Sequence, residues 1–222
     1  MDDVLFKKLV DNREEDSYAT AMRRKRFQFF LELLAHVPPP ISILDVGGTA
    51  NFWQRMGVVE QDDIRITLLN IDPTPLPSRQ FRAVVGDATN MREFKDEAFD
   101  VVFSNSVIEH VGDFEQQRRM ANEVRRVGRR YFLQTPNYFF PLEPHFLFPG
   151  FQWLPRDARV ALIRRFNLGW VKRIPDQAEA EARIDHTRLL RRGELRALFP
   201  TASWYEEKIM GLTKSFVVYE GW

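Results

Sequence analysis

The sequence predicts an α/β fold in which helices cover both faces of a mostly parallel, seven-stranded sheet that ends in an antiparallel hairpin. Three observations support this prediction. Short apolar segments alternate with helical or loop segments, as parallel strands joined by crossovers require. Residues 99–104 are almost wholly apolar, which is typical of a strand covered on both faces. Only a short link joins the two late strands, which indicates an antiparallel pair.

The amino-terminal half is expected to alternate helices and strands. Apolar side chains over residues 18–36 fall on one face of a helix, and the run of three prolines that follows ends it. Asp113, with Gln116 three residues later, is expected to cap a second long helix that Gly128 ends. The remaining expected elements are a short helix over 51–56 and strands over 41–46, 65–71, 81–85, 99–104 and 130–134.

A long insertion, roughly 137–188, separates the fifth strand from a late helix expected over 192–199. Its first part, 137–154, is rich in aromatic residues and interrupted by prolines, so it is a poor candidate for a strand or a helix. Aromatic side chains left in water would be a liability, and we expect this part to form an ordered aromatic lid over a ligand. The two late strands are expected over 204–210 and 215–219.

The composition is that of an ordinary globular chain. A length of 222 residues suits one domain, with 44% hydrophobic and 28% charged residues. The net charge is +1 and the basic clusters are balanced nearby, so no nucleic acid partner is expected. The chain has no cysteine, which excludes disulfides and thiolate chemistry. Without a secretory signal or a long apolar run it is expected to be cytoplasmic, and its oligomeric state is not indicated.

The segment from Ile41 to Trp53 is the most informative, because a buried strand there ends in Asp45 and two glycines. Three later segments, Leu68–Asp72, Val85–Thr89 and Phe99–Val111, follow at suitable distances. Together they resemble the class I S-adenosylmethionine-dependent methyltransferases from about residue 41 to residue 137. A dinucleotide-binding dehydrogenase is less compatible, because its G-x-G-x-x-G motif is missing here.

The resemblance implies a Rossmann-like three-layer sandwich with S-adenosyl-L-methionine at the carboxyl ends of the strands. We expect a single methyltransferase domain over 1–222. Its parts would be a helical cap (1–40), a cofactor-binding half (41–136), the lid and substrate insertion (137–188) and the carboxyl-terminal helix and hairpin (189–222).

The resemblance also assigns cofactor contacts. The turn at Asp45, Gly47 and Gly48 would wrap the methionine and ribose portions, and Asp72 would accept the ribose hydroxyl hydrogens. Asp87 would accept from the adenine amino group, while Ala88 offers its backbone N–H. The fourth strand closes with Ser104 and Asn105, where a backbone carbonyl would meet the cofactor's amino group.

The glycine turn departs from the family pattern, because Thr49 and Asn51 stand where further glycines are usual. Asparagine tolerates left-handed backbone better than most residues, so Asn51 is expected to replace a glycine and remain part of the cofactor site. Thr49 is β-branched and harder to accommodate.

Two histidines are the candidates for a general base, should the acceptor need one. His145 lies in the predicted lid, and His186 follows Asp185, which could orient it. A metal site built from Glu109, His110, Glu143 and His145 is a further alternative, because paired Glu and His bind a divalent ion in some RNA-terminal methyltransferases. The Glu143-Pro-His145 spacing does not match their full pattern, so the sequence predicts no metal.

The expected activity is methyl transfer from S-adenosylmethionine to a small-molecule acceptor, with an apolar or aromatic acceptor favoured by the aromatic lid. Two alternatives stay open. One is a catalytically silent scaffold that binds the cofactor through the altered glycine turn. The other is a membrane-surface methyltransferase for a lipid-linked acceptor, with peripheral membrane contact through residues 146–154 and the arginines that follow them.

Overall fold

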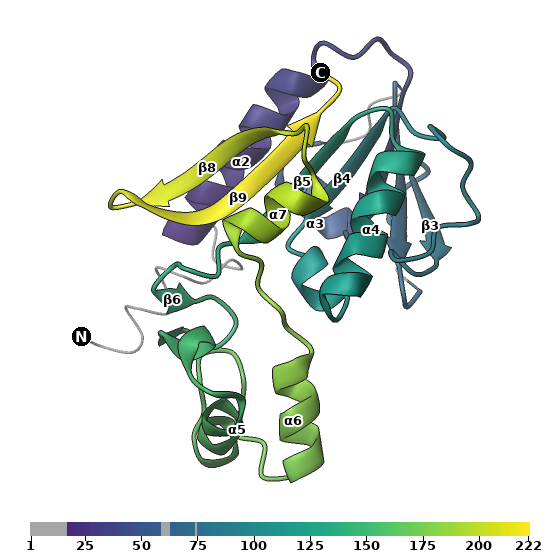
Figure 1. Ribbon diagram of the computed structural model, residues 1–222. Coiled ribbons are helices and arrows are strands. Elements are labelled where there is room, and N and C mark those ends of the chain that lie inside the picture. Colours follow the sequence, from purple (N-terminus) through teal and green to yellow (C-terminus); the bar gives the residue numbers. More distant parts are fainter. Residues whose placement is uncertain (1–16, 59–62, 74) are drawn as a thin grey trace.

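A computed structural model describes residues 17–58, 63–73 and 75–222. It contains a seven-stranded sheet in the order β3-β2-β1-β4-β5-β9-β8 (Figure 1). Strands β1 to β5 are parallel neighbours, whereas β9 pairs antiparallel with β5 and with β8, as the sequence predicted. The strands are β1 (Ile41–Val46), β2 (Ile64–Asn70), β3 (Phe81–Val85), β4 (Val101–Asn105), β5 (Tyr131–Pro136), β8 (Ser203–Ile209) and β9 (Leu212–Glu220).

Helices cover both faces of this sheet and complete a three-layer sandwich (Figure 1). On one face, helices α2 (Tyr18–Leu34) and α3 (Ala50–Arg55) bury aromatic side chains. On the other face, α4 (Phe114–Val127) and α7 (Arg192–Leu198) pack against the same strands. Burying such side chains contributes about 1.5–3 kcal/mol for each fully covered residue, which holds the layers together.

The sequence signals for helix ends are mostly confirmed. Asp113 caps α4 through a capping box with Gln116, and Gly128 ends the helix. Ser17 caps α2 by accepting the backbone N–H of Thr20. Among the helices in the described ranges, none has both the length and the apolar composition that crossing a bilayer requires. Residues 1–16 of the expected amino-terminal cap lie outside the described ranges.

A buried ion pair ties α2 to the sheet. Arg26 donates from Nη1 to Glu207 Oε2 at 2.5 Å and from Nη2 to Asn105 Oδ1 at 2.8 Å. Both charged side chains are buried, with 8% of Arg26 and 1% of Glu207 exposed. Ser215 donates a further hydrogen bond to the same carboxylate. This contact joins the end of β4 to the terminal hairpin through α2.

The insertion after β5 is a compact unit of its own below the sheet (Figure 1). It contains β6 (Leu142–Glu143), β7 (Phe148–Pro149), the short helix η2 (Phe151–Trp153), α5 (Arg156–Arg165) and α6 (Gln177–Asp185). Neither α5 nor α6 was predicted from the sequence. The rings of Phe146 and Phe151 stack at 4.2 Å and lie in the hydrophobic core of the insertion, so part of its aromatic content stabilises the insertion itself.

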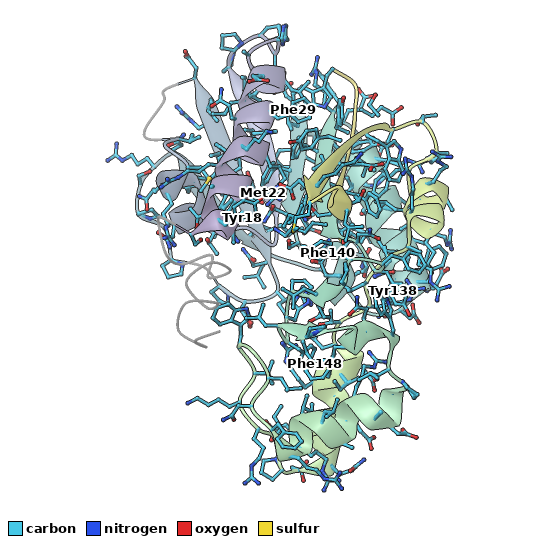
Figure 2. The ribbon with its side chains drawn as sticks, turned by 90° about the vertical axis from the view of Figure 1, so that its left-hand side faces the viewer. Tyr18, Met22, Phe29, Tyr138, Phe140 and Phe148 are labelled. Atoms are coloured by element: carbon cyan, nitrogen blue, oxygen red, sulfur yellow. The ribbon has the colours of Figure 1, made fainter. Side chains whose placement is uncertain are left out.

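The two stems of the insertion are held side by side by a bridge between Asn137 and Leu190. In Figure 2, Tyr138 and Phe140 of the first stem lie between the sheet and Phe148 of the insertion. The backbone N–H of Asn137 donates to Lys214 at 2.9 Å, and that of Tyr138 donates to Leu190 at 3.1 Å. The backbone N–H of Arg188 donates to Glu109 at 2.8 Å. Because β5 runs directly into the first stem, the insertion lies beyond the edge where the parallel strands end.

Replacing Arg26 by Ala is predicted to lower the free energy of unfolding by about 3 kcal/mol, because it leaves Glu207 buried without its cation. Chemical denaturation followed by circular dichroism measures the change. The matched control is Arg24→Ala, since Arg24 is exposed on the same helix and should change stability by less than about 0.5 kcal/mol. Equal losses in the two variants would contradict the importance of the buried pair.

Candidate functional site

The turn after β1 is shaped by two glycines and a buried carboxylate. Gly47 has φ +73°, a left-handed conformation that favours glycine, and its N–H donates to Leu69 at 2.8 Å. A Cβ on Gly48 would lie 1.6 Å from Asp45 Oδ2. The Asp45 carboxylate therefore occupies the space beside Gly48, and a larger residue at position 48 would have to displace that carboxylate or the turn.

The Asp45 carboxylate lies inside the protein rather than on its surface. It is 1% exposed and accepts a hydrogen bond from Trp53 Nε1 at 2.6 Å. Burial raises the pKa of Asp45 to about 7, and the Trp53 hydrogen bond opposes this shift. Asp45 thus joins β1 to α3 and supports the turn from below, while the backbone of the turn faces outward.

The structure explains the residues that replace the family glycines. Thr49 has extended backbone and caps α3 by accepting the Phe52 N–H at 3.3 Å, so a β-branched residue fits well. The expectation that Asn51 provides left-handed backbone is wrong, because Asn51 lies within α3 and has no positive φ. Glycine is not needed at these positions, since the chain has already entered the helix. Asn51 lines a small hollow of about 120 Å³ together with Arg23 and Arg55.

The ends of β2 and β3 place acidic residues at the same edge of the sheet as this turn. Asp72 lies two residues beyond β2 and is exposed, and it forms no hydrogen bond or ion pair within the described residues. Asp87 Oδ1 accepts from the N–H and the hydroxyl of Thr89 at 2.8 and 2.9 Å, which fixes the turn after β3. Ala88 is buried in the adjoining core.

Asn70, which the sequence analysis missed, donates from Nδ2 to the Gly48 carbonyl at 2.9 Å. It ties the end of β2 to the glycine turn. The sequence did contain a signal for this contact, because Asn70 is a polar amide at the last position of an otherwise largely apolar strand.

At the end of β4, Ser104 is fully buried and its hydroxyl has no partner within the described residues. The Asn105 Oδ1 already accepts from Arg26, so that oxygen is occupied within the protein. The sheet order β3-β2-β1-β4 makes these four strands neighbours. All nine predicted cofactor residues therefore belong to one edge, although the side chains of Asp45, Ala88 and Ser104 are buried there.

His145 belongs to a chain of polar side chains beyond β4. Its Nδ1 lies 2.7 Å from Glu143 Oε1 and its Nε2 lies 3.1 Å from His110 Nε2. His110 is at the end of the short helix η1 (Ile108–His110), next to Glu109. Burial, with the nearby His145 and His186, lowers the pKa of His110 to about 4, while burial raises that of Glu109 to about 7.

His186 is the exposed member of this group, and its ring stacks on His110 with centroids 5.2 Å apart. The expectation that Asp185 orients His186 is wrong. Asp185 instead accepts from Arg156 at 2.9 and 2.6 Å, which joins α6 to α5. His186 therefore owes its position to the end of α6 and to its contact with His110.

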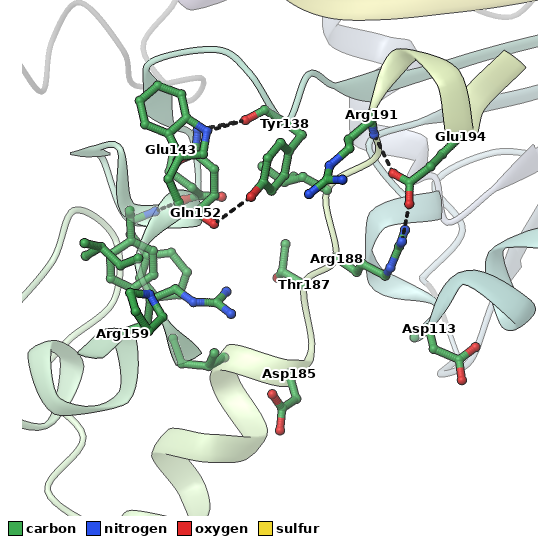
Figure 3. A pocket seen from close by; sticks show the side chains of 18 of the residues that line it. Asp113, Tyr138, Glu143, Gln152, Arg159, Asp185, Thr187, Arg188, Arg191 and Glu194 are labelled. Atoms are coloured by element: carbon green, nitrogen blue, oxygen red, sulfur yellow. Dashed lines mark hydrogen bonds and ion pairs between the residues drawn. The ribbon is translucent and has the colours of Figure 1, made fainter. Parts of the chain in front are cut away.

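A cavity of about 810 Å³ separates the insertion from the sheet (Figure 3). One wall carries Arg159, with Tyr138 and Gln152 nearby, and the facing wall carries Arg188, Arg191 and Glu194. The Nε of Arg159 is buried without a hydrogen-bond partner in the described residues. The guanidinium of Arg191 lies 4.9 Å from the centre of the Tyr138 ring. None of the nine predicted cofactor residues lines this cavity, so it is a second, separate surface.

Comparisons with known proteins agree with this arrangement. Residues 44–131 match the family model described as a methyltransferase domain. Among solved structures, the CurJ carbon methyltransferase aligns with a TM-score of 0.58 at 15% identity, covering 94% of this chain and 56% of that one. The PH0226 protein from Pyrococcus horikoshii OT3 aligns with a TM-score of 0.53 at 15% identity, covering 97% and 95%. A SAM-dependent methyltransferase from Methanosarcina mazei aligns with a TM-score of 0.50 at 15% identity, covering 84% and 94%.

Residues 44–131 thus form a methyltransferase domain, within a fold that solved methyltransferases share, and such a domain implies the use of S-adenosylmethionine. At the sequence level it is similar to Rv1509 and MT1557 of Mycobacterium tuberculosis, each 31% identical over 134 residues. That match covers 54% of this chain and 44% of each relative, so the chain matches less than half of their length.

The buried Asp45 gives a prediction about pH. Because its folded pKa of about 7 lies above the ordinary value of 3.8, the native state holds the proton more tightly and stability falls as pH rises between these values. Asp45→Asn keeps an acceptor for Trp53 but does not titrate. From about pH 5 to about pH 8 the wild type should lose about 2 kcal/mol more unfolding free energy than the variant. Urea denaturation across this range measures it, and parallel profiles would contradict the assignment.

Proposed function

We propose that this protein transfers the methyl group of S-adenosylmethionine to a small acceptor. The observation that supports this best is the exposed Asp72 carboxylate, which has no partner among the described residues and lies at the same sheet edge as the Gly47–Gly48 turn. Ligands of parallel α/β sheets bind at the carboxyl ends of the strands. A carboxylate there can accept both hydroxyl hydrogens of a ribose, and the glycines allow the backbone to approach the ligand closely.

The small hollow beside the turn adds positive charge where the amino-acid end of the cofactor would lie. Arg23, Asn51 and Arg55 line it, next to the first turn of α3. Burial, with the nearby Arg26 and Arg55, lowers the pKa of Arg23 to about 10, so an anionic ligand in this hollow would stabilise its charged form. The cofactor's carboxylate matches this charge.

We place the acceptor in the cavity between the insertion and the sheet edge. Tyr138 and Trp153 provide aromatic surface, in keeping with an apolar or aromatic acceptor. Arg159 and Arg191 add guanidinium groups on facing walls, as Figure 3 shows. Because guanidinium binds carboxylate and phosphate with two parallel hydrogen bonds, we propose an acceptor that also carries an anionic group.

Methyl transfer requires the protein mainly to align the nucleophile with the methyl group. The methyl group on a sulfonium is already electrophilic, so the protein must position the nucleophile and exclude water. Of the two proposed bases, His186 is exposed and lies beside the cavity-lining Thr187. Both ring nitrogens of His145 already have partners, so His145 is less available as a base.

The alternatives receive less support from the side-chain contacts. In the segment expected to contact a membrane, Phe146 and Phe151 are buried in the insertion, whereas Trp153 is 50% exposed. Arg156 and Arg164 are engaged by partners within the insertion rather than left free for lipid headgroups. A catalytically silent scaffold would be expected if the altered turn had lost its shape. Thr49 instead caps α3, and Gly47 and Gly48 are both present in the turn.

Replacing Asp72 by Ala is predicted to weaken S-adenosylmethionine binding at least tenfold, which corresponds to about 1.4 kcal/mol. The melting temperature should stay unchanged, because the carboxylate has no contact within the described residues to lose. Isothermal titration calorimetry measures the affinity. The matched control is Asp63→Ala, an exposed aspartate that precedes the other end of β2 and should bind like the wild type. Equal S-adenosylmethionine affinity of the two variants would contradict the assignment of Asp72 to the cofactor site.

Replacing Arg159 by Ala is predicted to reduce turnover about tenfold or more with acceptors that carry a carboxylate or phosphate, through loss of a charged hydrogen bond. Neutral analogues of the same acceptors should be unaffected. Formation of S-adenosylhomocysteine across a panel of paired acceptors measures both rates. Arg165→Ala, at the exposed end of the same helix, is the control. An equal loss with neutral and anionic acceptors would contradict the proposed specificity.

A further inference from the structure

Three side chains that no step of the proposed reaction requires converge beyond the end of β4. Glu109 and His110 come from η1, and His145 comes from the insertion, 35 residues away from His110. One ligand atom from each lies within 4.8 Å of the others. The insertion therefore folds back so that its histidine meets a Glu-His pair on the sheet edge.

The hydrogen bond that His145 donates to Glu143 fixes the tautomer of His145. A carboxylate only accepts, so the Nδ1 that lies 2.7 Å from Glu143 Oε1 must carry the proton. Glu143 is itself held in place, because its other oxygen accepts the backbone N–H groups of His145 and Phe146, each at 2.7 Å. In a neutral imidazole this leaves a lone pair on His145 Nε2, which is the arrangement found at metal-binding histidines.

That lone pair points at a second imidazole nitrogen. His110 Nε2 lies 3.1 Å from His145 Nε2, and the other nitrogen of His110 lies 3.4 Å from the Thr187 hydroxyl. Two such nitrogens either share a proton or share a cation. At metal–nitrogen distances of about 2.05 Å, a separation like this one corresponds to a ligand angle of about 100°, close to tetrahedral.

Glu109 supplies an independent observation. Its side chain is fully buried, and Oε2 accepts from the Thr135 hydroxyl at 3.0 Å, but Oε1 has no partner within the described residues. A buried carboxylate oxygen without a hydrogen bond is costly, so it requires a compensating group. A cation between Glu109 and the two histidines would satisfy it.

We propose that Glu109, His110 and His145 bind one divalent transition-metal ion of the Zn²⁺ type, with Glu143 orienting His145. Two imidazoles and one carboxylate suit Zn²⁺ or Co²⁺, whereas Mg²⁺ and Ca²⁺ prefer oxygen ligands alone. Three protein ligands leave a fourth position open. The geometry differs from the linear spacing considered in the sequence analysis, because Glu143 acts through His145.

The ion would lie at the wall of the cavity, because Glu143 and Thr187 both line it. If the cavity holds the acceptor, an oxygen or nitrogen of that molecule can occupy the open position and lose a proton more readily. That consequence rests on the proposed function, whereas metal binding itself does not.

The test uses the full chain, stripped with EDTA and titrated with Zn²⁺ and with Co²⁺. Isothermal titration and elemental analysis should give one equivalent of metal, and Co²⁺ should develop the visible absorption of a four-coordinate site. His145→Ala and the nearly isosteric Glu109→Gln should each weaken binding tenfold or more. Glu143→Gln, which no longer requires a proton on Nδ1, should weaken it about tenfold to a hundredfold.

His36→Ala is the matched control, since His36 is exposed on α2's carboxyl-terminal side and should leave metal binding unchanged. Circular dichroism confirms that each variant is folded. Failure of the wild type to bind Zn²⁺ tighter than about 1 mM would overturn the inference and leave a direct N–H···N bond between the histidines. Equal binding by the wild type and Glu109→Gln would overturn it as well. S-adenosylmethionine affinity, measured on the same stripped protein, reports separately on the proposed function.

Discussion

The buried hydrogen bond between Trp53 and Asp45 is the interaction on which the candidate cofactor site depends. It joins the end of β1 to α3 across a turn of only a few residues. The carboxylate fills the space that a side chain at position 48 would need, so the turn has glycine there, between the ends of the neighbouring strands β2 and β4. Asn70 then fixes the same turn from the β2 side. Asp45, which the family pattern assigns to the cofactor, therefore stabilises the turn through its contact with Trp53.

The insertion gives the fold its second functional surface. Its stems form backbone hydrogen bonds with β9, with η1 and with each other, and these bonds define its position relative to the sheet edge. Its own hydrophobic core makes it a compact unit rather than a loose cover. Two features depend on this fixed position of the insertion. One is the cavity with charged walls, and the other is the contact between His145 and His110. The cofactor edge and the acceptor cavity are thus built by different parts of the chain.

The sheet and the glycine turn could be predicted because strands and turns leave local signals, such as the apolar run at β4 and the capping box of α4. The conformation of Asn51 was predicted wrongly, because a family pattern was applied where α3 already begins. Contacts between distant segments left no local signal. Arg26 and Glu207 are 181 residues apart, and His110 meets His145 only after the insertion folds back.

Hydrogen–deuterium exchange with and without S-adenosylhomocysteine tests the central claim most directly, because it maps a ligand onto the backbone without knowledge of the acceptor. The account predicts slower exchange in three separated segments, the turn after β1 and the loops after β2 and β3, which hold Gly48, Asp72 and Asp87. Slower exchange only in the insertion, or no change in any segment at saturating ligand, would contradict it.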